Sequence, residues 1–192
     1  MRHRPQRYRD SEDNARVRSI SDVYSAIVKT LLIMRHAKSS WKDPTLEDHE
    51  RPLNRRGQRD APRMGRLIKK KGLVPELVLS STAVRARTTA RLVAEACGYE
   101  GPVTRLDDLY LSDARAILEI LQQLPDESSR VMLVGHNPDL EDLVLELSGE
   151  DETIVTAALA VLQLPVTSWA ELRAGLTGKL VELFRPKELP PG

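Results

Sequence analysis

Two histidines, His36 and His136, each follow a short apolar run of the kind that forms a buried strand. Residues 31–34 (LLIM) lead into Arg35 and His36, and residues 131–134 (VMLV) lead through Gly135 into His136. Ligand sites in open α/β sheets lie just beyond the carboxyl ends of the strands, so both imidazole rings are expected to face one site. This placement is the main indication of chemistry in the sequence.

A third strand end adds an arginine to the same edge. The run that ends at residues 80–82 (SST) leads into a helix with Arg85 in its first turn. Helix N-termini offer unpaired backbone N–H groups, and the guanidinium groups of Arg35 and Arg85 match phosphate oxygens. Nearby arginines also lower the pKa of a histidine, which leaves a neutral nitrogen able to attack phosphorus. The sequence therefore predicts a phosphate pocket.

Metal binding is the competing interpretation of the histidine pair. Two neighbouring arginines would repel a cation, and no acidic ligand accompanies either histidine motif. We therefore expect neither a metal nor another cofactor.

The rest of the chain alternates between strand and helix patterns, which places these segments in one sheet. Strands are expected at 30–35, 76–80, near 103, at 130–135, 158–164 and 179–184. Between them, Asp60 is expected to cap a helix that stops at Gly72, a second helix covers 83–97, a third buries apolar residues at 117–124, and Asn137 caps a helix that Pro138 opens. This alternation indicates an α/β fold: a single three-layer α/β/α domain with a mostly parallel central sheet.

Composition and charge narrow the functional classes. The 192 residues are 41% hydrophobic and 30% charged, which suits one ordinary domain, and the formal charge of +1 provides no global field to hold nucleic acid or an anionic membrane. No apolar stretch reaches the length of a membrane span. The single cysteine, Cys97, excludes an intramolecular disulfide and fits a reducing cytoplasm. We expect a disordered extension at 1–27, the domain at 28–187 and a tail at 188–192.

Three motifs resemble the signature segments of the histidine phosphatase (phosphoglycerate mutase-like) superfamily. They are residues 35–37 (RHA), residues 81–90 (Ser81, Arg85-Ala86 and Thr89-Ala90) and residues 135–138 (GHNP). Residues 34–41 (MRHAKSSW), 51–57 (RPLNRRG) and 60–61 (DA) are similar to its SixA-type phosphohistidine phosphatase branch. The resemblance runs from about Lys29 to Pro186 and implies a phosphoglycerate mutase-like fold.

The resemblance also implies roles for the strand-end residues. His36 would be the nucleophile that becomes phosphorylated, Arg35 and Arg85 would clamp the phosphoryl oxygens, and His136 would complete the positive pocket. Phosphoryl transfer requires mainly alignment and charge stabilisation, which these side chains supply without a metal. Water would then hydrolyse phospho-His36.

Three further residues are expected to bind the substrate: Lys38, Arg51 and Asn137. Lys38 and Arg51 belong to the polar loop predicted at 39–58 or adjoin it, where they would line the entrance to the pocket. Each of these two could equally be a solvated loop residue.

The leaving group separates the possible substrates. Many members of the superfamily place a glutamate after the third strand to protonate the leaving oxygen, whereas this chain has Leu106-Asp107-Asp108 there. Asp108 is either a general acid or a solvated loop residue. Phosphohistidine needs less protonation because its P–N bond is weak, so phosphohistidine in a protein is the favoured substrate. The alternatives are a small-metabolite phosphomonoester phosphatase and a phosphate-binding regulatory module with little turnover. The oligomeric state is not predicted.

Overall fold

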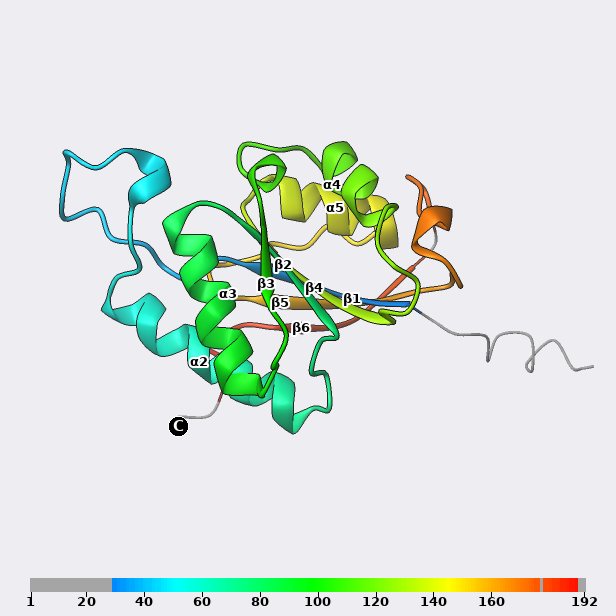
Figure 1. The fold of residues 1–192 in the computed structure, drawn as a ribbon, viewed down its shortest axis with the longest axis horizontal. Coiled ribbons are helices and arrows are strands. Elements are labelled where there is room, and N and C mark those ends of the chain that lie inside the picture. The colour runs from blue at the N-terminus through cyan, green and yellow to red at the C-terminus, as the bar shows by residue number, and fades with distance from the viewer. Residues whose placement is uncertain (1–28, 177, 190–192) are drawn as a thin grey trace, which may run out of the picture.

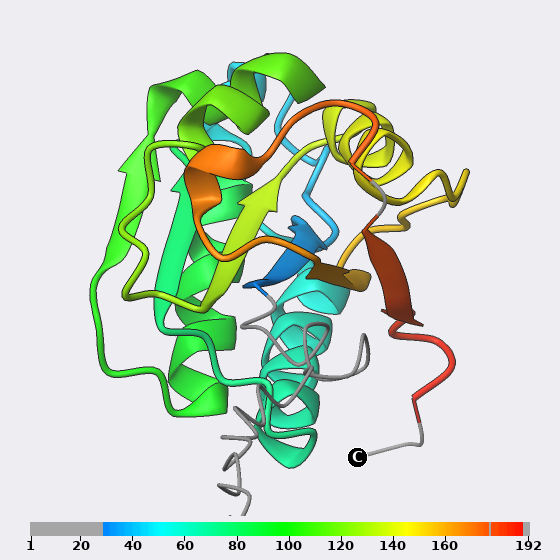
Figure 2. The same cartoon turned by 90° about the vertical axis from the view of Figure 1, so that its right-hand side faces the viewer.

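A single six-stranded sheet organises the chain in the computed structural model, which describes residues 29–176 and 178–189. The expected extension at 1–27 and residues 190–192 of the expected tail lie outside the described residues. The strand order is β3-β2-β4-β1-β5-β6 (Figures 1 and 2), and Figure 2 shows β3 and β6 at the two edges. The strands are β1 Lys29–Arg35, β2 Leu77–Ser81, β3 Val103–Leu106, β4 Arg130–Gly135, β5 Leu159–Leu164 and β6 Lys179–Phe184.

Strand direction confirms the mostly parallel sheet. The first four strands in spatial order run parallel, whereas β5 is antiparallel to β1 and β6 is antiparallel to β5. Arg35 of β1 lies opposite Gly135 of β4, and Ser80 of β2 lies opposite Val134 of β4. The carboxyl ends of these three strands are therefore level at one edge of the sheet.

Helices cover both faces of the sheet, which confirms the three-layer domain. Helices α2 (Arg55–Lys70) and α3 (Val84–Cys97) lie on one face, and α4 (Ala114–Leu121) and α5 (Asp139–Ser148) lie on the other (Figure 1). Leu32 and Met34 of β1 pack towards the first pair, and Leu31 and Ile33 pack towards the second. Because both faces are covered, the central residues 31–34 of the strand are all apolar. None of the helices in the described ranges is long and apolar enough to cross a membrane.

The first helix begins earlier than predicted. Asn54, not Asp60, is its N-cap, and the Asn54 side chain accepts a hydrogen bond from the backbone N–H of Gly57 at 2.9 Å. Asp60 instead lies buried within α2, where the arginines at positions 56, 59 and 63 approach its carboxylate. These cations offset the cost of burying a carboxylate, so the helix continues through a residue that would otherwise favour its start.

The last predicted cap is also wrong. Helix α5 begins at Asp139, and Pro138, which has no capping side chain, precedes it. The Asn137 amide nitrogen instead donates a hydrogen bond to the carbonyl of Ile154 at 3.0 Å. The Asn137 side chain therefore binds a residue distant in sequence instead of capping the helix as predicted.

The start of α2 holds the backbone that follows His36. Lys38 accepts a hydrogen bond from the Asn54 N–H at 2.9 Å, and Ser39 pairs with Leu53 in an isolated antiparallel bridge. Gly57 lies directly against the backbone of Lys38, leaving no room for a Cβ atom. The glycine therefore permits the close approach that anchors this segment.

We predict that Gly57→Ala destabilises the protein despite the better helix propensity of alanine. Alanine favours a helix over glycine by about 1 kcal/mol, but overpacking against the Lys38 carbonyl is expected to cost about 1–3 kcal/mol. Urea unfolding monitored by circular dichroism measures the difference, with Gln58→Ala at the adjacent exposed position as the control. A Gly57→Ala protein more stable than the wild type would contradict this packing.

Candidate active site

A cavity of about 430 Å³ opens at the level carboxyl edge of the sheet. Residues from the ends of β1 and β4, the start of α3 and two loops surround it. They are Arg35, His36, Asp48, Arg85, Tyr110, Leu111, Ser112, His136, Asn137, Pro138 and Asp139. Five of the predicted site residues are thus brought together.

His36 presents an unprotonated nitrogen at this cavity. Its Nδ1 lies 2.8 Å from the Ala37 carbonyl, which can only accept, so Nδ1 carries the proton and Nε2 the lone pair. Arg85 Nε donates to His36 Nε2 at 3.3 Å. Burial, together with the charges of Arg85, Arg35 and Arg51, lowers the His36 pKa to about 4, against the raising effect of the Ala37 hydrogen bond. The ring is therefore neutral at physiological pH.

His136 lies beside His36 with the opposite tautomer. The two ring centroids are 5.0 Å apart, and Arg85 Nη2 is 3.4 Å from His136 Nδ1. A guanidinium can only donate, so Nδ1 accepts and Nε2–H donates to Ser81 Oγ at 2.9 Å. Burial, followed by the effects of His36 and Arg85, lowers the His136 pKa to about 3. Strand β2 therefore supplies the serine that orients the second imidazole.

Arg35 contributes a buried donor from the end of β1. Its Nη1 donates to the Ile154 carbonyl at 2.9 Å, the same carbonyl that binds the Asn137 amide. Its Nε atom is buried and has no hydrogen-bond partner in the described part of the chain, and the same holds for Asn137 Oδ1. Unpaired buried polar atoms are rare in proteins, and both of these belong to residues that line the cavity.

Lys38 and Arg51 do not line the cavity. Lys38 is engaged through its backbone at the start of α2, as described above. Arg51 is buried, donates to Ser39 Oγ at 2.8 Å and to the Ser40 carbonyl at 3.1 Å, and stacks on the Trp41 ring 3.1 Å from its centroid. Its Nη1 is 2.6 Å from Asp48 Oδ1. Arg51 therefore holds the loop together behind the cavity.

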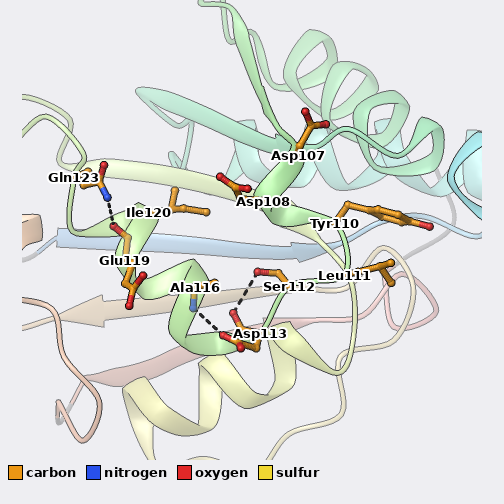
Figure 3. Close-up of a pocket in the computed structure, with 10 residues that line it drawn as sticks. All are labelled: Asp107, Asp108, Tyr110, Leu111, Ser112, Asp113, Ala116, Glu119, Ile120 and Gln123. Atoms are coloured by element: carbon orange, nitrogen blue, oxygen red, sulfur yellow. Dashed lines mark hydrogen bonds between the residues drawn. The ribbon is translucent and has the colours of Figure 1, made fainter.

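Asp108 lines a neighbouring cavity of about 520 Å³, which Figure 3 shows. The short helix η2 (Asp107–Leu109) carries it, and its side chain extends away from Tyr110, on the far side of the same segment (Figure 3). Asp113 and Glu119 also line this second cavity. The structure does not bring Asp108 to the two histidines.

Asp48, Tyr110 and Asp139 are cavity residues that the sequence did not single out. Asp48, in the short helix η1 (Asp48–Glu50), pairs with Arg85, and the Tyr110 hydroxyl donates to Asp48 Oδ2 at 3.1 Å. The Tyr110 ring meets His136 edge to face, with centroids 5.6 Å apart. Asp139 follows the GHNP motif directly, and burial raises its pKa. For Asp139, its position next to the GHNP motif could have indicated a place in the cavity. The sequence held no comparable signal for Asp48 or Tyr110.

The arrangement can place an oxyanion against a neutral nucleophile. The guanidinium groups of Arg35 and Arg85 line the cavity together with His36, and such donors match phosphoryl oxygens. Within residues 29–176 and 178–189, no three His, Cys, Asp or Glu side chains gather where they could hold a metal ion.

Comparisons with known proteins agree with this geometry. Residues 31–110 match the model of the histidine phosphatase superfamily, branch 1. An uncharacterized chloroplastic protein of Arabidopsis thaliana is 34% identical over 181 residues, covering 87% of this chain and 83% of its own. A crystal structure assigned to phosphohistidine phosphatase SixA of Agrobacterium tumefaciens is 28% identical, with a TM-score of 0.71, covering 82% of this chain and 98% of that one.

A second SixA structure, of the protein histidine phosphatase complexed with tungstate, is 26% identical with a TM-score of 0.73. It covers 84% of this chain and 99% of that one. The chain therefore belongs to branch 1 of the histidine phosphatase superfamily, in its SixA-type group of phosphatases.

Proposed function

We propose that this phosphatase uses His36 as its nucleophile and removes phosphate from phosphohistidine in a protein. The observation that carries the proposal is the unprotonated His36 Nε2, which accepts from Arg85 Nε at the cavity that the second imidazole also lines. The SixA structures that resemble this chain include one bound to tungstate, a tetrahedral oxyanion. The names of these SixA structures support phosphohistidine as the proposed substrate.

The reaction proceeds in two displacements. His36 Nε2 attacks phosphorus, the P–N bond of the substrate breaks, and the leaving imidazole keeps a proton. The positive charge that develops on the His36 ring is stabilised by the Ala37 carbonyl, which accepts from Nδ1. Water then attacks phosphorus, and phosphate leaves from Nε2. Arg35 and Arg85 donate to the phosphoryl oxygens in both steps, and His136 completes the pocket.

A small-metabolite phosphomonoesterase is the second candidate, and one observation favours it. An alkoxide leaving group needs a proton donor, and Asp139 lines the cavity with a pKa that burial raises. Asp108 would need to reach across from the neighbouring cavity to do the same. Both carboxyl groups are therefore candidates for that proton donor.

The proposal includes a cytoplasmic location, for which the buried free thiol of Cys97 is the support. The name of the Arabidopsis relative assigns that protein to the chloroplast.

Replacing His36 by alanine is expected to abolish turnover, because it removes the nitrogen that is proposed to attack phosphorus. Rapid quenching of the wild type with labelled phosphohistidine protein should trap an acid-labile, base-stable adduct on His36. Thermal melting of His36→Ala is the control for folding. Full activity of a folded His36→Ala protein would sink this mechanism.

Both cavity histidines are expected to stay neutral from about pH 5 to about pH 8, because their folded-state pKa values lie near 4 and 3. An ordinary histidine titrates near 6.5, so the unfolded chain binds more protons below that pH. Their contribution to stability is therefore complete above about pH 6.5 and is lost as pH falls towards the folded pKa values. Nitrogen-15 NMR of labelled histidine measures protonation directly. Titration of either ring near 6.5 in the free protein would contradict this.

Leaving-group dependence separates the two candidate substrates. For phosphohistidine, Asp108→Asn and Asp139→Asn should each change kcat/KM by less than about threefold, and alkyl phosphates should be poor substrates of all three proteins. If the protein acts on metabolites, Asp139→Asn should penalise alkyl phosphates far more than aryl phosphates. Efficient alkyl phosphate hydrolysis that collapses in either variant would reassign the substrate.

A further inference from the structure

Asp48 reaches the cavity from a loop rather than from a strand end. Its carboxylate is about half exposed and contacts three side chains: Arg85 Nη2 at 2.8 Å, Arg51 Nη1 at 2.6 Å and the Tyr110 hydroxyl at 3.1 Å. Its main-chain carbonyl also accepts from Arg85 Nη1. Asp48 therefore binds one arginine through both its backbone and its side chain.

The guanidinium of Arg85 is held along two edges. Asp48 takes the outer edge, formed by Nη1 and one N–H of Nη2. The inner edge, formed by Nε and the other N–H of Nη2, faces His36 Nε2 at 3.3 Å and His136 Nδ1 at 3.4 Å. Since a guanidinium is planar and rigid, fixing one edge fixes the direction of the other.

We infer that Asp48 is a positioning residue for phosphoryl transfer: it grips the outer edge of Arg85 so that the inner edge meets the phosphoryl group at His36. The catalytic meaning of this inference rests on the proposed function. Arg51 serves as the anchor behind Asp48, because it is itself buried and bound to Ser39 and Ser40. Two consecutive ion pairs thus link the loop to Arg85, and a hydrogen bond links Arg85 to the nucleophile.

An ionised carboxylate next to Arg85 could also act in the opposite way, as an internal anion that substrate must displace. Burial raises the Asp48 pKa, but hydrogen bonds from Arg51 and Arg85 outweigh it and leave the pKa below its usual value. The geometry favours positioning, because Asp48 leaves the histidine-facing edge of Arg85 to the cavity. The two roles predict opposite effects on anion binding.

The test compares Asp48→Asn with Asp43→Asn. Asp43 lies in the same loop but bonds to Thr45 and does not line the cavity. We expect Asp48→Asn to weaken vanadate binding and lower kcat/KM for phosphohistidine by about 10- to 100-fold, with the melting temperature retained. Asp43→Asn should change either quantity by less than about twofold. Tighter vanadate binding in Asp48→Asn would overturn the inference in favour of a displaced internal anion.

A double-mutant cycle shows whether Asp48 acts through Arg85. In an Arg85→Ala background, Asp48→Asn should weaken vanadate binding by less than about twofold, because the group that it positions is absent. A full, additive loss would overturn the inference. Asp48→Ala repeats the cycle if the asparagine variant does not fold. Calorimetry measures vanadate binding without turnover. If the wild type had no phosphatase activity, the proposed function would be refuted, but the double-mutant cycle would still show whether Asp48 positions Arg85.

Discussion

The pairing of β1 with β4 in parallel and in level register is the constraint on which the site depends. Neighbouring strands in a sheet lie about 4.8 Å apart, so residues that follow two level strand ends must be neighbours. Arg35 opposite Gly135 therefore makes His36 and His136 adjacent, although 100 residues separate them in the chain. Strand β2, on the other side of β4, brings Ser81 and the start of α3 to the same edge. The buried leucines, valines and methionines of these strands fix the register, and the reactive groups follow from it.

Burial and charge then act in the same direction on the two imidazoles. Both rings are only 9% exposed, and both lie among guanidinium groups, so the protonated forms are disfavoured twice. Hydrogen bonding determines where the remaining proton of each ring lies: the Ala37 carbonyl holds it on Nδ1 of His36, and Ser81 holds it on Nε2 of His136. The cavity thus combines two guanidinium groups with an uncharged nucleophile, which is a combination that suits an incoming phosphoryl group.

The strand-end residues were predictable from sequence because strands advance regularly and their ends must meet. The sheet, its parallel core and the edge where His36, Arg85 and His136 gather all follow from that regularity. Asp48 and Tyr110 were not predictable, because irregular segments carry them and their paths depend on tertiary contacts such as the Arg51 network. The helix start at Asn54 and the side-chain contact of Asn137 were missed for a related reason. A cluster of arginines around Asp60 outweighed its preference for a helix start. The Ile154 carbonyl, which is distant in sequence, outweighed the capping preference of Asn137.

The position of Trp41 has a consequence for observation. The chain has two tryptophans. Trp169 is fully buried near Lys29, at the start of β1, whereas Trp41 is 74% exposed and stacks on the guanidinium of Arg51. Arg51 is bound to Asp48, Asp48 to Arg85, and Arg85 to the nucleophile. The indole of Trp41 is therefore the outermost member of a series of contacts that begins at His36, and a displacement of Arg51 is expected to change its emission.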